Sequence, residues 1–168
     1  MLSMFRRCVR MFVPLALTAA VLCPAVIAAQ EKPPFTDADK AAIELMLDRY
    51  ARAFSTKDYA TLRETLQAPF VNFPGNFSVM ETLDEVMSSY RTLRERQPSE
   101  YDHSSWGQST LIVLSPDRAL FDRKWRRYRK DGSVSLESAG VYVVSKSSGT
   151  WKLCGVFNRD TNEFGKTH

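Results

Sequence analysis

Apolar residues recur at helical spacing over the stretch 37–56. They are separated by four, three and four positions, which places them on one face of a helix, while charged residues occupy the other face. These apolar positions are Ile43, Leu47, Tyr50 and Phe54. Thr36 stands immediately before the stretch, and its hydroxyl can accept a hydrogen bond from the first turn. The pattern predicts an amphipathic helix that begins after Thr36 and ends at the polar sequence 56–58.

A short second helix is predicted directly after this break. Asp58 can cap it, and Tyr59, Leu62 and Leu66 give it an apolar side. Pro69 lacks a backbone N–H group and is expected to end this helix.

A strand, a turn and a third helix follow. Residues 70–73 form a short, mostly apolar strand, and the sequence 74–76 is typical of a turn. Thr82 and Glu85 have the spacing of a capping box, and Pro98 closes the helix that they open. The apolar face of this helix consists of Leu83, Val86, Met87, Tyr90 and Leu93.

Three turn signals divide the rest of the chain into four strands. The signals are Ser115-Pro116-Asp117, Lys130-Asp131-Gly132 and Ser147-Ser148-Gly149, and the strands between them cover residues 101–114, 119–129, 133–145 and 150–158. Strands joined by such short turns run antiparallel, because a parallel return needs a crossover of about a dozen residues or more. The sequence therefore predicts an α+β domain in which three helices pack on one face of a curved antiparallel sheet.

The first 29 residues are typical of a secretory signal peptide. Arg6, Arg7 and Arg10 precede an apolar run that ends in small residues. A retained membrane anchor is the alternative, but the run is interrupted by two prolines and no charged stop follows it. We predict cleavage near Ala29 and a periplasmic or secreted protein with no stable membrane anchor. The remaining chain is expected to form an exposed leader (30–36), a domain (37–158) and a tail (159–168).

Cleavage would change the charge and the cysteine content. The chain has 23 basic and 19 acidic residues, and loss of three arginines leaves a net charge of +1, which does not favour nucleic acid as a partner. The basic segment 123–130 is interpreted as an exposed hairpin. Cys154 would be the one cysteine left, so neither an internal disulfide nor a cysteine-based zinc site is expected. No metal and no cofactor are predicted.

The order of elements, together with two local sequences, resembles a known superfamily. The first comprises Tyr50-Ala51-Arg52-Ala53-Phe54, Lys57-Asp58-Tyr59 and Phe73-Pro74-Gly75, and the second comprises Gly140-Val141-Tyr142-Val143 and Gly149-Thr150-Trp151-Lys152-Leu153. Over about residues 37–157 the chain is similar to the nuclear transport factor 2-like superfamily, which includes SnoaL-like cyclases and ketosteroid isomerases. This fold hosts enzymes, carriers and protein-binding modules, so the resemblance implies a fold more than a function.

The resemblance implies a conical, mostly apolar pocket between the helices and the sheet. In ketosteroid-isomerase-like members a tyrosine of the first helix donates a hydrogen bond to the substrate, and Tyr50 has the matching place, eight residues before Asp58. Those enzymes also need two carboxyl groups, but Phe73 and Pro74 stand at the first position, and Ala139 and Gly140 near the second. Tyr50 is therefore a catalytic candidate without an identified base.

A set of side chains is predicted to line this pocket. The candidates are Tyr50, Phe54, Phe73, Tyr90, Trp106, Phe121, Arg123, Trp125 and Glu137. Strand alternation places Phe121, Arg123, Trp125 and Arg127 on one face, which we expect to be the concave one. Arg123 is then expected either to pair with an inward acid such as Glu137 or to bind a ligand anion, unless the strand twists it out to solvent. His103, beside Asp102, is interpreted as an exposed residue rather than as half of a general-base pair.

Three functions remain open. The leading hypothesis is an exported module that binds a small apolar or weakly anionic ligand in the pocket. The second is an isomerase, lyase or cyclase that uses Tyr50. The third is a protein-interaction module whose pocket is plugged by Phe70, Phe73 and Trp106. The resemblance also makes a homodimer through the sheet a candidate assembly.

Overall fold

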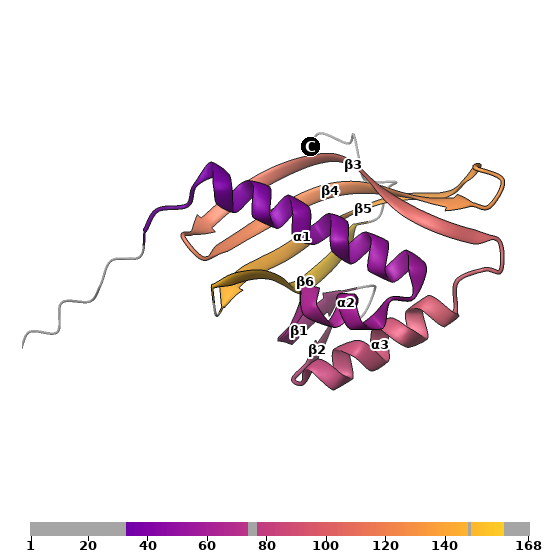
Figure 1. Ribbon diagram of the computed structural model, residues 1–168, viewed down its shortest axis with the longest axis horizontal. Coiled ribbons are helices and arrows are strands. Elements are labelled where there is room, and N and C mark those ends of the chain that lie inside the picture. The colour runs from indigo at the N-terminus through magenta and orange to yellow at the C-terminus, as the bar shows by residue number, and fades with distance from the viewer. Residues whose placement is uncertain (1–32, 74–76, 148, 160–168) are drawn as a thin grey trace, which may run out of the picture. The chain divides into compact units, whose positions relative to one another are not determined.

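The computed structural model describes residues 33–73, 77–147 and 149–159, and these form three helices and six strands (Figure 1). The expected signal peptide at 1–29, the turn at 74–76 and the tail beyond Arg159 lie outside the described residues. In the part of the chain that is described, no helix is long and apolar enough to cross a membrane.

The first helix, α1 (Asp37–Thr56), confirms the sequence prediction. The Thr36 hydroxyl accepts a hydrogen bond from the Asp39 backbone at 3.2 Å, and the Asp39 carboxylate accepts one from the Thr36 backbone at 3.1 Å. This reciprocal capping box satisfies two of the N–H groups that a helix start leaves free. The helix ends at Lys57, whose φ of 59° turns the chain out of the helical path.

Two shorter helices follow, α2 (Tyr59–Thr65) and α3 (Leu83–Glu95). Asp58 caps α2, and Thr82 with Glu85 forms the predicted capping box of α3. The α2 helix ends at Thr65, four residues before the expected stop at Pro69, because the chain is already extended at Leu66. Arg94 ties α3 to the end of α1 by donating hydrogen bonds to the carbonyl oxygens of Phe54 and Ser55.

One sheet contains all the described strands, in the order β2-β1-β6-β5-β4-β3. Their bounds are β1 (Leu66–Phe73), β2 (Ser78–Met80), β3 (Tyr101–Ser115), β4 (Arg118–Arg129), β5 (Val134–Ser147) and β6 (Thr150–Arg159). The four long strands are antiparallel neighbours, as predicted. The prediction of a wholly antiparallel sheet is wrong at one place, since β1 runs parallel to β6. The chain between β1 and β6 passes through α3 and four other strands, and short turns along the sequence do not reveal a pairing at that distance.

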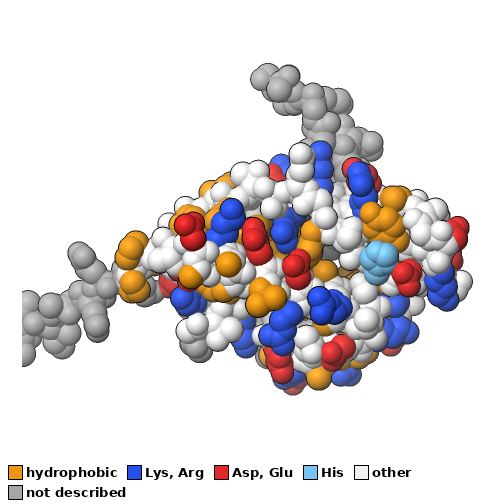
Figure 2. Space-filling view, turned by 45° about the horizontal axis from the view of Figure 1, so that its top comes forward, with side chains coloured by type: hydrophobic (Ala, Val, Ile, Leu, Met, Phe, Trp, Pro, Cys, Tyr) orange, Lys and Arg blue, Asp and Glu red, His pale blue; other side chains and the backbone are white. Residues whose placement is uncertain are grey.

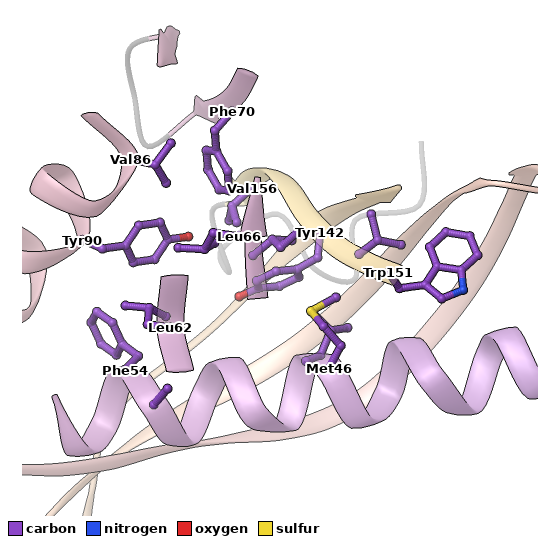
Figure 3. Packing of buried hydrophobic residues seen from close by; sticks show 14 of the residues in the cluster. Met46, Phe54, Leu62, Leu66, Phe70, Val86, Tyr90, Tyr142, Trp151 and Val156 are labelled. Atoms are coloured by element: carbon purple, nitrogen blue, oxygen red, sulfur yellow. The ribbon is translucent and has the colours of Figure 1, made fainter. Parts of the chain in front are cut away.

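The helices cover one face of this sheet, and the core lies between them (Figures 1 and 3). The apolar stripe of α1 packs there, with Ile43 and Leu47 fully buried against Phe121 and Val144 of the sheet. The surface is mixed, with acidic and basic side chains interspersed over the face seen in Figure 2.

Candidate functional site

A cavity of about 690 Å³ lies between α1, α3 and the covered face of the sheet. Its volume falls within the range of small-molecule sites, about 300 to 1,000 Å³. The wall combines aromatic rings with polar groups from every described strand. The wall residues used below are Tyr50, Phe54, Tyr90, Trp106, Trp125, Arg127, Tyr142 and Val156.

Five of the nine predicted pocket residues line this cavity. They are Tyr50, Phe54, Tyr90, Trp106 and Trp125. The rings contact one another: Tyr50 stacks on Trp106 with centroids 6.2 Å apart, and Tyr90 meets Tyr50 edge to face at 5.8 Å. The cavity is therefore bounded by a preformed aromatic wall.

Phe73 and Phe121 do not line the cavity. Phe73 is 40% exposed and stacks on Phe157, its register partner on β6. Both rings lie on the face of the sheet that the helices leave uncovered, since Val156, the neighbour of Phe157, lines the cavity. Phe121 does point inward, as predicted, but it is fully buried in the core.

Arg123 lies on the concave face but outside the cavity wall. It is 7% exposed, and its guanidinium carbon lies 5.0 Å from the Trp106 ring centroid and 5.5 Å from that of Phe121. The buried Nε and Nη1 atoms of Arg123 have no hydrogen-bond partner among the described residues. Burial lowers the pKa of this guanidinium, while the nearby charges of Asp48 and Glu44 on α1 act in the opposite direction.

The expected pairing of Arg123 with Glu137 is wrong. Glu137 is exposed and accepts a hydrogen bond from Arg126 at 2.7 Å, its register partner across β4 and β5. Register partners share a face, and Arg126 alternates with the inward Arg123 and Arg127, so this ion pair lies on the uncovered face. The pKa of the Glu137 carboxyl is lowered by that hydrogen bond.

Several residues that line the cavity were not predicted from the sequence to do so. Tyr142 lies opposite Phe121 in register, so strand pairing carries its ring to the covered face. Strand alternation puts Arg127 on the same face as Arg123 and Trp125, but Arg127 was not among the predicted pocket residues. Asn72 and Asn158 come from β1 and β6, and only the parallel pairing of these strands brings them to one wall.

Three tyrosine hydroxyls converge on the cavity. The Tyr50 hydroxyl donates a hydrogen bond to that of Tyr90 at 3.2 Å, which leaves the hydrogen of Tyr90 unused. Figure 3 shows the hydroxyls of Tyr90 and Tyr142 pointing toward one another from α3 and β5. Burial raises the pKa of Tyr50 to about 12 and raises the pKa of Tyr90 and of Tyr142 well above their ordinary values. All three are therefore hydrogen-bond donors at neutral pH.

Arg127 brings a positive charge to the wall. Its guanidinium carbon lies 4.9 Å from the centroid of the Trp125 ring. Burial lowers the pKa of Arg127, and no acidic side chain of the described ranges pairs with it. The buried Nε of Arg127 and the buried Nε1 of Trp125 both lack a hydrogen-bond partner among the described residues.

Carboxylates are scarce at the cavity. Glu85 lines it, but its carboxylate accepts hydrogen bonds from the backbone of Glu81 at 2.8 Å and of Thr82 at 3.1 Å. It therefore serves as a helix cap. Within the described residues no group of three metal-ligating side chains is close enough to hold an ion.

His103 and Asp102 lie outside the cavity, and the structure corrects one detail of their interpretation. They are exposed, as expected, yet the Nδ1 atom of His103 lies 2.7 Å from an Asp102 oxygen. A register shift between Tyr101 and His103 breaks the alternation that would have separated the two side chains. The imidazole stacks on Tyr128, with centroids 4.7 Å apart.

This architecture, with three helices over a mostly antiparallel sheet and a cavity between them, defines the nuclear transport factor 2-like (NTF2-like) class. Residues 38–161 match the family described as NTF2-like protein (DUF6841), and the chain belongs to that family. A search of curated protein sequences gives no match.

Solved structures agree on the fold. A cystatin-like-fold protein of unknown function from Nostoc punctiforme is 12% identical, with a TM-score of 0.65 over 75% of this chain and 93% of that one. A candidate ketosteroid isomerase from Shewanella frigidimarina is 16% identical, with a TM-score of 0.57 over 70% and 94% of the two chains. A candidate NTF2-like dehydratase from Streptomyces avermitilis is 16% identical, with a TM-score of 0.57 over 73% and 95%. At these identities the similarity is one of fold.

Proposed function

We propose that this protein binds a small apolar or weakly anionic ligand in the cavity beneath α1 and α3. The observation that carries the proposal is the cavity itself: about 690 Å³ bounded by aromatic rings already in mutual contact. A wall that is formed before the ligand arrives spares the cost of ordering side chains on binding.

The test is to block the cavity from α3. Ser89 lines the cavity, so Ser89→Phe would fill part of it, whereas Glu95→Phe places the same ring on an exposed site of the same helix outside the wall. Native mass spectrometry of the purified protein is expected to show a co-purifying small molecule that Ser89→Phe loses and Glu95→Phe keeps. A protein that carries no ligand and binds no apolar fluorophore would contradict the proposal.

An isomerase, lyase or cyclase that uses Tyr50 is the second candidate, and it has less support. The Tyr50 hydroxyl is already bonded to Tyr90, and a pKa of about 12 makes it a poor proton donor in acid–base catalysis. The one acidic residue of the cavity wall, Glu85, is held in the helix cap. Efficient isomerisation of a Δ5-3-ketosteroid, abolished by Tyr50→Phe, would establish the enzyme instead.

A protein-interaction module with a plugged pocket is the third candidate. Of its three expected plugs, Phe70 belongs to the core, Phe73 faces away and Trp106 lines a cavity that stays open. These positions favour a ligand over a plug.

A homodimer through the sheet has separate support. On the uncovered face, one row across five strands is entirely apolar: Val71, Gly155, Val143, Leu120 and Ile112 are successive register partners. We infer that this row meets a second copy of the chain. Sedimentation velocity is expected to give a dimer that Ile112→Lys dissociates, while Lys124→Glu, also on that face but outside the row, leaves it intact. A monomeric parent protein would refute the assembly.

Export is part of the same proposal. Its support is the sequence of Arg6, Arg7 and Arg10 followed by the apolar run to Ala29. The thiol of Cys154 suits an oxidising compartment, because burial raises its pKa and it donates a hydrogen bond to the Val143 carbonyl oxygen. Sequencing of the mature N-terminus is expected to begin near Gln30. A membrane-held chain that still begins at Met1 would contradict export.

A further inference from the structure

Charges along β4 are balanced on one face of the strand and unbalanced on the other. On the uncovered face Arg126 is paired with Glu137 at 2.7 Å. On the covered face, the next residue, Arg127, has neither an ion-pair partner nor a side-chain hydrogen bond among the described residues. Burying a guanidinium nitrogen without a hydrogen-bond partner is costly, and for the buried Nε of the half-buried Arg127 the described residues supply none.

Several polar groups of the same cavity wall offer hydrogen-bond donors. The Nε1 atom of Trp125 is buried without an acceptor, and the hydroxyl hydrogen of Tyr90 is not used in its bond with Tyr50. Tyr142 adds a third donor that stays protonated, because burial raises its pKa well above the ordinary value. The one carboxylate of the wall, that of Glu85, already accepts two backbone hydrogen bonds. The wall also holds acceptors, such as the amide oxygens of Asn72 and Asn158, but its buried polar atoms without a partner, Trp125 Nε1 and Arg127 Nε, are both donors suited to an anion.

The number of charges narrows the ligand to a monoanion. Arg127 is the half-buried cation of the described wall, whereas Arg96, the other cation there, is exposed at the end of α3. A phosphate monoester would bring close to two negative charges, whereas a carboxylate brings one and fits a guanidinium through two parallel hydrogen bonds. The rest of the wall, with Phe54, Trp106 and Val156, is suited to a flat apolar body.

We propose that the ligand is a monocarboxylic acid with a flat apolar body, and that Arg127 binds its carboxylate while the aromatic wall holds the body. This inference rests on the proposed ligand-binding function and specifies its chemistry. It assigns specificity for acids to a residue of β4 and leaves packing of the body to α1, β3 and β6.

The experiment compares an acid with its neutral amide. The probes are 4-phenylbutyrate and 4-phenylbutanamide, which differ in charge but little in size, and binding is measured by calorimetry at pH 7.5. The acid is expected to bind at least about tenfold more tightly than the amide to the unaltered protein, and Arg127→Met should bring the ratio close to one. Arg126→Met, the neighbouring substitution on the opposite face, should leave the ratio unchanged.

The outcomes separate the two proposals. Equal binding of acid and amide to the unaltered protein would overturn the carboxylate proposal and leave the cavity as an apolar site. Failure of both probes, together with no binding of an apolar fluorophore, would remove the proposed function as well. If Arg127→Met does not fold, the unaltered protein still decides the question: affinity for the acid should fall as the pH drops through the acid's own pKa, while affinity for the amide should not.

Discussion

Charged side chains lie beneath both halves of α1. Near the start of the helix the charge is paired, and toward its end the charges have no acidic partner among the described residues. Near the start of the helix, Asp39 is 9% exposed and accepts hydrogen bonds from Lys146 at 2.8 Å, Trp151 at 3.0 Å and the Thr36 hydroxyl at 2.7 Å. Toward its other end, Arg123 is buried and Arg127 is half-buried, and the buried Nε atoms of both have no hydrogen-bond partner among the described residues.

The difference separates stability from function. Asp39 ties the start of α1 to β5 and β6 through Lys146 and Trp151, so its cost of burial is recovered within the fold. Arg127 contacts the Trp125 ring but has no acidic partner among the described residues, although it lines the aromatic cavity between α1, α3 and the sheet. A charge that the protein leaves unpaired beside a cavity is evidence for a ligand, whereas a paired one is evidence for a structural joint.

The largest effect on stability is expected near the start of α1, where Asp39 is paired. Trp151 is 3% exposed and supplies both a large buried ring and the Nε1 donor to Asp39. Trp151→Ala should lower the free energy of unfolding by about 3 to 5 kcal/mol, measured by urea denaturation. Trp151→Phe keeps most of the packing and should cost clearly less. An alanine variant as stable as the parent would show that this joint is not structural.

The pH dependence of the stability that Asp39 contributes through Lys146 and Trp151 gives a second test. Hydrogen bonds from Lys146, Thr36 and Trp151 hold the pKa of Asp39 far below its ordinary value of 3.8. The carboxylate stabilises the fold fully above that ordinary value, and this stabilisation is lost as the pH falls toward the lowered pKa. The difference in melting temperature between the parent and Asp39→Asn should therefore be constant near neutrality and should shrink below about pH 4.

The control for this test is Asp37→Asn, an exposed acid in the first turn of the same helix. It should cost less than Asp39→Asn at neutral pH. If the gap for Asp39→Asn instead widens as the pH falls, the sign of the argument is wrong.

Beneath the second half of α1, where the charges are unpaired, one substitution is expected to stabilise the fold. Arg123 buries two nitrogens without partners, and methionine can keep the contact with Trp106 while removing the charge. Arg123→Met should raise the free energy of unfolding by about 1 to 3 kcal/mol, measured by urea denaturation. Arg126→Met, which removes an exposed ion pair on the other face, should change it by less than about 1 kcal/mol. A destabilised Arg123→Met would show that Arg123 has a partner in solution.

Much of the fold followed from local chemistry in the sequence. The caps at Thr36, Asp58 and Thr82 fixed the helix starts, and the turns after Ser115 and Lys130 fixed two hairpins. The sequence failed where partners are far apart along the chain. Nothing near Leu66 reveals that it enters a strand beside β6, because that pairing depends on the sheet that later residues build.

Strand alternation predicted which side chains of β4 face inward, and little else about the site. Alternation placed Arg123 and Trp125 correctly on the inner face of β4. It could not decide which inner residue reaches the cavity, and the structure gives that place to Arg127 and not to Arg123. The pairing of Glu137 depended on the register across the hairpin, which sequence spacing alone left open.

The smallest effect is expected from removing one hydroxyl at the cavity, and a matched tyrosine makes it informative. Tyr50→Phe breaks a 3.2 Å hydrogen bond to Tyr90, whose hydroxyl can turn to water or ligand in the cavity. The loss of stability should be at most about 1 kcal/mol by urea denaturation. Tyr101→Phe breaks bonds of 3.1 and 3.0 Å to the hydroxyls of Ser55 and Ser104, and neither Tyr101 nor Ser55 lines the cavity. Ser55 is buried and keeps its bonds to the Ala51 carbonyl and the Ser104 backbone, but two hydrogen bonds of the buried Tyr101 are lost, so this variant should lose about 1 to 3 kcal/mol. Equal losses for the two variants would mean that the cavity hydroxyl of Tyr50 is as structural as the buried hydroxyl of Tyr101, and the distinction between polar groups kept for a ligand and polar groups paired within the fold would fail.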